Sequence, residues 1–143
     1  MQYPPLVHYA TVAEYRAHFD RVYCQGPLTT FDAIKVRFRR EQFDHYFFES
    51  VKARDDTFSR RRAERIDWVA VALVDPGAEL RVGWDNHRKR PAPNRRVAIV
   101  VQDYVVVIRM VRAGWAELVT AFVADARTLA QIRTNPLWKR KNR

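Results

Sequence analysis

The sequence predicts one α+β domain, in which N-terminal helices and an early strand are followed by a four-stranded antiparallel sheet and a C-terminal helix. Two patterns indicate this class. In the first half of the chain apolar residues recur three and four positions apart, as on helices, whereas in the second half they alternate with polar residues, as on strands. The length of 143 residues fits a single domain over 1–143, and 48% hydrophobic residues are enough for a core.

The first predicted element is a helix that starts after Thr11. This residue is a typical N-cap, and a glutamate three positions later completes a capping box. The helical pattern continues to residues 26–27, where a Gly-Pro pair ends it. Residues 34–38 alternate between apolar and polar, which predicts a strand with its apolar face on the core. Lys35 and Arg37 then face outward, where they are candidates for contact with nucleic acid.

Two further helices are expected before the sheet. A short one covers 41–52, because Phe43 and Phe47 stand one helical turn apart. A longer one covers 58–73, since Ser59 is a suitable N-cap, an apolar stripe follows it, and an Asp-Pro-Gly sequence stops the helix.

The second half of the chain is expected to form a meander of four antiparallel strands separated by turn residues. A closing helix is expected over 125–133, where an Asn-Pro pair follows. The basic residues 139–143 are expected to form a frayed tail. The four strands are expected at about 79–84, 96–101, 104–111 and 116–123.

The chain is strongly basic. It contains 26 Lys and Arg against 16 Asp and Glu, a net charge of +10, which favours an anionic partner. A membrane is disfavoured, because no stretch approaches the roughly 20 apolar residues of a span. Cys24 is the only cysteine, so neither an intrachain disulfide nor a cysteine-based zinc site is expected. Together with an N-terminus that lacks signal-peptide features, this predicts a cytoplasmic protein.

His45 is the residue best suited to chemistry. It stands among aromatic and acidic residues in the segment FDHYFFES, and histidine can move protons near neutral pH. On a helix Glu49 lies one turn away, where its carboxylate could orient the imidazole or act as a base. The competing interpretation is a histidine packed among aromatic rings with its nitrogens hydrogen-bonded.

An arginine cluster follows in the segment SRRRAER. On a helix Arg61 and Arg65 share one face, and Arg62 neighbours Arg65. Guanidinium groups can bind adjacent phosphate oxygens and stabilise the extra charge of a pentacoordinate phosphorus. The alternative is a solvated helix face that is paired with nearby acids.

Further candidates lie in the second half of the chain. Thr120 is a polar residue in an apolar strand, and its hydroxyl can hydrogen-bond a phosphate, although threonine is also a common strand residue. Trp84, Tyr104 and Trp115 could stack on unpaired bases or belong to the core. The clearest basic loop covers residues 86–95. Its candidate contacts to nucleic acid are His87, Arg88, Lys89, Arg90 and Arg95.

Sequence signatures of metal and nucleotide sites are absent from the chain. It has no HExxH, P-loop or GxGxxG motif, and its acidic residues do not cluster as a two-metal nuclease requires. Neither a metal ion nor a cofactor is expected.

Several segments together resemble a known family. They are FDHYFFES, FSRRRAERIDWV with LVDP after it, RRVAIVVQDYVVVIRM, ELVTAFVAD and IRTNPLW, within residues 31–138. In order and spacing they resemble the phage-type branch of the barnase–EndoU–colicin–RelE (BECR) nuclease superfamily. Members typically have N-terminal helices followed by a four-stranded antiparallel sheet. They are small metal-independent ribonucleases, often toxins that a cognate inhibitor holds in check.

This resemblance implies catalytic roles at a few positions. The histidine of the family falls on His45, its helix arginine on Arg65 or Arg62, and its late Ser or Thr on Thr120. These residues would cleave RNA by attack of a 2'-hydroxyl on the adjacent phosphorus.

Barnase-like members also use an acidic general base, for which the sequence has no clear equivalent; Glu49 or Glu41 could take its place. The resemblance implies a toxin of a toxin–antitoxin pair, with RNA as substrate and an acidic antitoxin or immunity protein as partner. The rival expectation is a non-catalytic RNA- or DNA-binding module that uses the same basic face. A third is a basic protein whose charge serves only an acidic protein partner.

Overall fold

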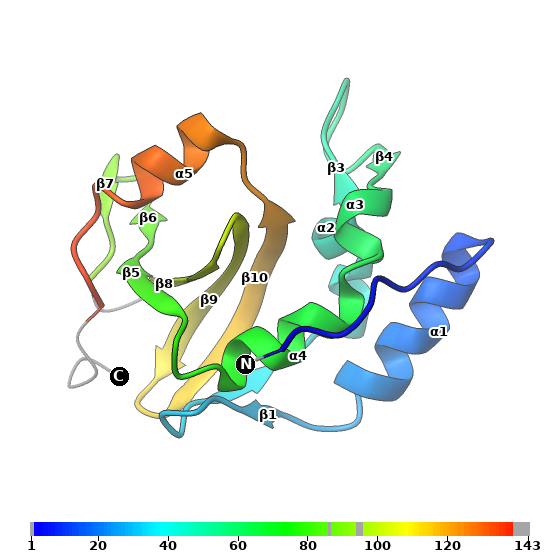
Figure 1. Cartoon of the computed structure of the whole chain (residues 1–143), viewed down its shortest axis with the longest axis horizontal. Helices are drawn as coiled ribbons and strands as arrows, with labels where there is room; N and C mark the ends of the chain where they lie inside the picture. The colour runs from blue at the N-terminus through cyan, green and yellow to red at the C-terminus, as the bar shows by residue number, and fades with distance from the viewer. Residues whose placement is uncertain (1, 86, 94–95, 139–143) are drawn as a thin grey trace.

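The computed structural model describes residues 2–85, 87–93 and 96–138. Within them the chain is a mixed α+β structure with five α-helices, one six-stranded sheet and two small two-stranded sheets (Figure 1), which confirms the predicted class. Arg95 and the tail 139–143 lie outside the described residues. In the described part of the chain, no helix combines the length and the hydrophobicity needed to cross a bilayer.

The central sheet contains the four strands of the meander as antiparallel neighbours, in the order β10–β9–β8–β5. It also has two further strands, because the early strand β2 pairs in parallel with β10 and carries β1 at the edge. The sheet therefore has six strands where the sequence predicted four and a separate early strand. In sheet order the strands are β1 (Leu28–Thr29), β2 (Lys35–Arg37), β10 (Trp115–Val123), β9 (Tyr104–Arg112), β8 (Arg96–Val101) and β5 (Glu79–Val82).

One face of the sheet is covered by the first four helices, which enclose the main core (Figure 1). Helix α1 (Val12–Tyr23) begins with the predicted capping box at Thr11. It directs Phe19 into a cluster of aromatic rings that joins the N-terminal helices to each other. The rings around Phe19 belong to Tyr23, Phe38, Phe43, Tyr46 and Phe47.

The helix predicted over 41–52 is shorter than expected. A 3₁₀ turn (Arg40–Gln42) leads into α2 (Phe43–Phe47), and the chain then forms β3 (Phe48–Glu49), which pairs with β4 (Thr57–Phe58) as a hairpin. The apolar run of Phe47 and Phe48 fits a strand as well as a helix, and pairing with β4 decides the outcome. Glu49 is therefore on a strand and not one helical turn beyond His45.

The helix predicted over 58–73 is divided into α3 (Arg60–Ala63) and α4 (Ile66–Val74). Ser59 caps α3 as predicted, and its hydroxyl accepts from the Arg62 N–H at 3.3 Å. The break follows from a contact with the N-terminal segment, because the Glu64 carbonyl accepts a 2.8 Å hydrogen bond from the Val7 N–H. The Trp68 N–H bonds to the Arg65 carbonyl instead, so the helix restarts on a shifted axis.

The opposite face of the sheet carries α5 (Ala126–Ile132), capped by Asp125. Leu129 and Ile132 pack with residues of β8 and β9 in a second, smaller core. The chain then runs back along β5, where the Val82 N–H donates to the Pro136 carbonyl at 2.8 Å. Trp138 is 5% exposed and anchors this return. Only part of this face is therefore covered.

The β3–β4 hairpin is closed by an acid-rich loop. The Asp56 carboxylate accepts hydrogen bonds of 2.9 Å from the N–H groups of Val51, Lys52 and Ala53. Asp55 adopts a left-handed backbone with φ of 51° and donates its N–H to the Ser50 hydroxyl at 2.9 Å. A left-handed aspartate is uncommon, and here the loop contacts hold it in place.

We expect Gly83→Ala to destabilise the fold. A Cβ at Gly83 would lie 2.5 Å from Cβ of Arg96, because the two backbones are joined by a 2.8 Å hydrogen bond. Relieving this overlap should lower the free energy of unfolding by about 1–3 kcal/mol, measured by chemical denaturation. Gly77→Ala is the matched control, since a Cβ there meets only the Asp75 carboxylate at 3.3 Å. Equal stability of the two variants would contradict the close approach at Gly83.

The hairpin loop should open in acid. The backbone hydrogen bonds from Val51, Ala53 and Lys52 lower the pKa of Asp56 from 3.8 to about 2. A carboxyl whose folded-state pKa lies below its unfolded value stabilises the fold above the unfolded pKa, and this contribution disappears as the pH falls through about 2. The backbone N–H groups of residues 51–53 should therefore exchange with solvent faster as the pH falls from 3.8 to about 2. Asp56→Asn should exchange fast throughout; unchanged protection in that variant would exclude the proposed role of the carboxylate.

Candidate active site

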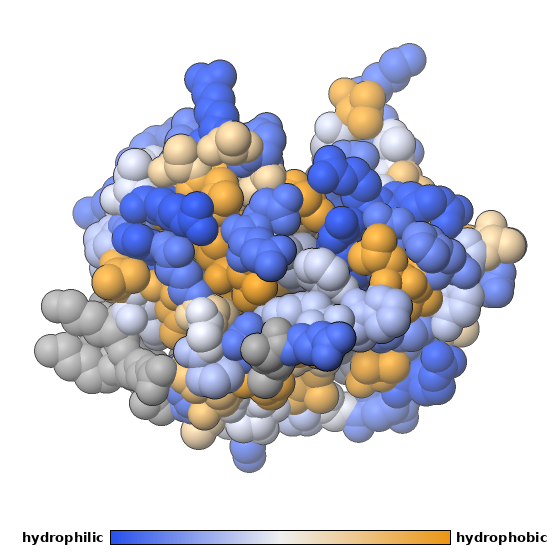
Figure 2. Space-filling model, in the orientation of Figure 1, coloured by the Kyte–Doolittle hydropathy of each residue, from blue (hydrophilic) through white to orange (hydrophobic). Residues whose placement is uncertain are grey.

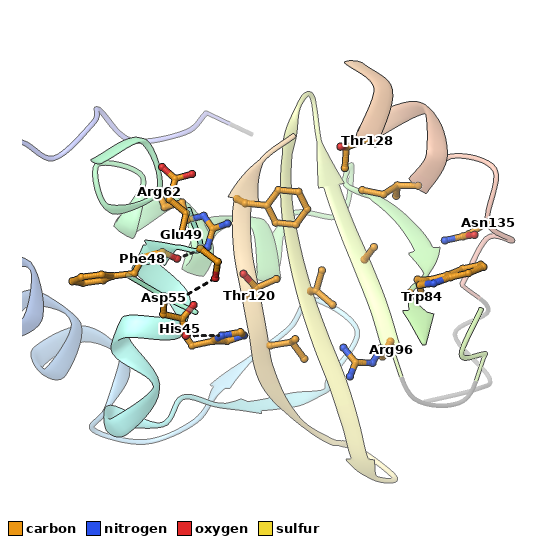
Figure 3. Close-up of a pocket in the computed structure, with 17 residues that line it drawn as sticks. His45, Phe48, Glu49, Asp55, Arg62, Trp84, Arg96, Thr120, Thr128 and Asn135 are labelled. Carbon is orange, nitrogen blue, oxygen red and sulfur yellow. Dashed lines mark hydrogen bonds and ion pairs between the residues drawn. The ribbon is translucent and has the colours of Figure 1, made fainter. Parts of the chain in front are cut away.

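A cleft of about 740 Å³ opens on the uncovered part of the sheet, between α5 and the β3–β4 hairpin. Figure 2 shows it as a recess between two projecting parts of the surface. Its floor is apolar, formed in part by Ala98, Val107 and Phe122. Polar and charged groups project over this floor from the hairpin side and from the sheet (Figure 3). They belong to His45, Glu49, Ser50, Asp55, Arg62, Arg96 and Thr120.

His45 reaches the cleft from the last turn of α2. The neighbouring residues Tyr46 and Phe47 are buried, and they fix the helix on the core. The ring is directed toward the strand that carries Thr120 (Figure 3). Nδ1 of His45 lies 3.4 Å from Oδ2 of Asp55, and the His45 side chain is 35% exposed. A carboxylate on one ring nitrogen orients the imidazole and leaves the other nitrogen for a ligand.

Arg62 enters the cleft from α3. Its Nη1 donates a 2.9 Å hydrogen bond to the carbonyl oxygen of Phe48, at the start of the hairpin. Burial lowers the pKa of the Arg62 guanidinium, while the charges of Glu49 and Asp55 act in the opposite direction. Arginine remains protonated at any physiological pH, so the cleft holds a half-buried positive charge beside two carboxylates.

Thr120 faces the cleft because of an irregularity in β10. Leu118 pairs with Ile108 and Thr120 with Val107, which leaves Val119 as an extra residue between them. Before this bulge the even-numbered residues of the strand face the main core, as Leu118 does; after it the odd-numbered ones do, as Ala121 does. The bulge therefore turns the Thr120 hydroxyl onto the open face.

The structure brings together His45, Glu49, Arg62 and Thr120 from the residues expected at a site, but not Arg65 or Arg61. Arg65 bonds to the Arg61 carbonyl at 2.8 Å and to Glu64 at 3.1 Å, and its guanidinium lies 5.3 Å from the ring centre of Trp68. Because α3 ends before Arg65, the two arginines 62 and 65 point in different directions.

The other expected base, Glu41, also lies elsewhere. Its carboxylate is exposed and stands 3.8 Å from Arg39. Lys35 and Arg37 project from the exposed side of β2, as the sequence predicted, but do not line the cleft. Nζ of Lys35 lies 5.1 Å from the ring centre of Trp115, which is also covered by Arg112 at 5.0 Å.

The basic loop extends from a two-stranded ribbon, β6 (Trp84–Asp85) and β7 (Arg90–Pro91). The Asp85 carboxylate accepts from the N–H groups of His87 and Arg88, and these bonds lower its pKa. The side chains of the loop are exposed, and Trp84 at its base lines the cleft. Tyr104, by contrast, is 1% exposed and belongs to the core. The exposed loop residues are His87, Arg88, Lys89 and Arg90.

Sequence reasoning missed Asp55, the partner of His45, and a charged cluster on the adjoining sheet surface. The Glu117 carboxylate binds Arg109 and, at 2.9 Å, Arg39. Burial raises the pKa of Glu117, but the two arginines outweigh it and hold the pKa below its ordinary value. A second hollow of about 410 Å³ contains this cluster and shares His45 and Arg96 with the cleft. In the sequence, the only feature that sets Glu117 apart is that it is an acidic residue in an otherwise apolar strand.

This arrangement can hold a phosphate. It offers a hydroxyl and a guanidinium as donors, an imidazole oriented by Asp55, and a second carboxylate, Glu49. Across residues 2–85, 87–93 and 96–138, no three His, Cys, Asp or Glu side chains gather as the ligands of a metal ion would.

Comparison with protein-family models, with curated proteins and with solved structures finds no match for this chain. The likeness to BECR nucleases therefore rests on the sequence motifs, and function has to be argued from the chemistry of the cleft itself.

Proposed function

We propose that the protein is a metal-independent endoribonuclease that cleaves RNA by 2'-hydroxyl transesterification. The observation that carries this proposal is the presence, in one cleft of a basic chain, of His45 with its carboxylate partner, Arg62 and Thr120. These residues come from three separate parts of the sequence. The imidazole–carboxylate pair suits proton transfer, and the guanidinium and hydroxyl suit a phosphate.

Proton transfer needs two groups, one for each oxygen on phosphorus. The 2'-oxygen forms a bond to phosphorus as it loses its proton, and the bond from phosphorus to the 5'-oxygen breaks as that oxygen gains one. Asp55 orients the His45 ring through Nδ1 and leaves the other ring nitrogen toward the cleft, and we assign to His45 the role of acid for the 5'-oxygen. Glu49 lines the same cleft without contacting His45, and we assign to it the role of base for the 2'-hydroxyl. The products are a 2',3'-cyclic phosphate and a 5'-hydroxyl.

The remaining groups act on charge and position. Arg62 is half-buried, so its charge is less screened by water and stabilises the additional negative charge of the phosphorane. The Thr120 hydroxyl donates to a phosphate oxygen. Arg96 lines both the cleft and the adjoining hollow, where it can bind the next phosphate of the strand.

The same charge distribution suits an inhibitor. An acidic antitoxin or immunity protein would bind the basic groups around the cleft and exclude RNA from it. We propose such a protein as the physiological partner, since a net charge of +10 favours rapid association with an acidic surface.

Wild-type protein should cleave single-stranded RNA in the presence of EDTA and leave cyclic phosphate ends, and its expression without an inhibitor should arrest growth. His45→Ala should lose about 100-fold or more in rate, the usual contribution of a positioned acid or base, while RNA affinity is retained. His8→Ala is the matched control, because His8 is exposed and lies 3.7 Å from Glu64, outside the cleft. RNA binding without cleavage by the wild type would instead support a non-catalytic binding module.

The two helix arginines should differ in their effect on cleavage. Arg62→Ala should reduce the rate on the order of 100-fold, because it removes charge stabilisation in the transition state. Arg65→Ala removes the same charge from the chain but not from the cleft, and should keep a rate within about threefold of wild type. Thermal melting of both variants verifies folding. A loss in Arg65→Ala equal to that in Arg62→Ala would contradict the assignment.

A further inference from the structure

A side pocket opens from the cleft at the end farthest from His45. It has a volume of about 500 Å³ and shares four of its residues with the cleft, so a ligand can pass from one to the other. The pocket lies between the β6–β7 ribbon and α5 with the segment that follows (Figure 3). Its residues are Trp84, Thr128, Gln131, Ile132, Thr134 and Asn135.

The indole of Trp84 is unusually accessible. Trp84 is 44% exposed, and it is the only aromatic among the strongly exposed large hydrophobic residues of the described chain. The other three tryptophans are buried or already contact other groups of the protein. Trp138 is buried, Trp68 donates its indole N–H to the Pro4 carbonyl, and the Trp115 ring contacts Lys35 and Arg112. An exposed indole beside a polar cleft is the arrangement on which an unpaired base stacks.

Polar groups of fixed position face the same space. The backbone of Asn135 is held by hydrogen bonds, from its N–H to Ile132 and from Arg81 to its carbonyl. Within the described residues the side-chain amides of Asn135 and Gln131 make no hydrogen bond to protein. Each amide offers both a donor and an acceptor, the combination that reads the edge of a nucleobase.

We propose that this side pocket binds one unpaired nucleobase of the RNA, stacked on Trp84 with its edge toward Asn135 and Gln131. This inference rests on the proposed function, because the base belongs to the strand whose scissile phosphate lies at His45 and Arg62. The exposed cations of the neighbouring loop, Arg88 to Arg90, favour a nucleic acid over an apolar peptide as the occupant. The pocket would thereby select single strands, whose bases are free to leave the stack.

The test uses a 2'-O-methyl oligonucleotide, which cannot be cleaved by 2'-hydroxyl attack, and measures binding by fluorescence anisotropy. Trp84→Ala should weaken binding of the single strand on the order of 10-fold, and Trp84→Phe should restore most of it. Binding of a fully paired duplex should not change, because its bases are stacked within the helix. Trp115→Ala is the matched control and should stay within about twofold of wild type, since the Trp115 ring already contacts Lys35 and Arg112 and lies outside the pocket.

The roles of the Asn135 and Gln131 side-chain amides are tested with oligonucleotides that differ in the identity of one base. Asn135→Ala and Gln131→Ala should alter the ranking of affinities among oligonucleotides that differ at one base, while thermal melting stays unchanged. Equal weakening of single strand and duplex in Trp84→Ala, or no weakening of either, would overturn the base pocket. These outcomes are distinct from failure of the proposed function: protein that does not cleave RNA but binds single strands through Trp84 would keep the pocket and reject the nuclease.

Discussion

The geometry of the cleft depends on how the start of α3 is joined to the end of α2. The carbonyl groups at the end of a helix lack partners within it, and here the Ser59 N–H bonds to the Phe47 carbonyl while Arg62 bonds to that of Phe48. Leaving such a carbonyl unpaired costs about 1–3 kcal/mol where it is shielded from water. The same guanidinium therefore fixes the hairpin that carries Asp55 and presents positive charge to a ligand, and a structural and a functional role coincide in one side chain.

The fold follows from the sequence where local patterns are unambiguous. Alternation identified all four strands of the meander, and Thr11 and Ser59 were recognisable as helix caps. The errors arose where a distant contact decides the outcome. The Val7 N–H takes the Glu64 carbonyl and divides a helix that looks continuous in sequence. The pairing of β2 with β10 joins residues about 80 positions apart, and no local pattern reports such a partner.

The candidate site was predictable in its residue types but only partly in its geometry. His45 and Thr120 were identifiable as polar residues in apolar surroundings. The choice between Arg62 and Arg65 was not, because an unbroken helix would place them on neighbouring positions of one face, and only the break between α3 and α4 separates their directions. Asp55 was hidden because its approach to His45 requires a left-handed backbone in a hairpin loop, and several acids of that segment could equally have formed it.

Because side chains alternate along a strand, the number of residues in β10 decides on which face of the sheet Thr120 lies. Leu118 and Thr120 already pair with consecutive residues of β9, so deleting Val119 would remove the bulge and leave Thr120 on the open face and Ala121 in the core. A one-residue deletion beyond the bulge would instead turn the following side chains to the other face. Inserting two residues would preserve the facing of the strand, whereas inserting one would not. Evolution or engineering of this protein can therefore remove the bulge, but elsewhere in β10 the number of residues can change only in steps of two if Thr120 is to stay on the open face.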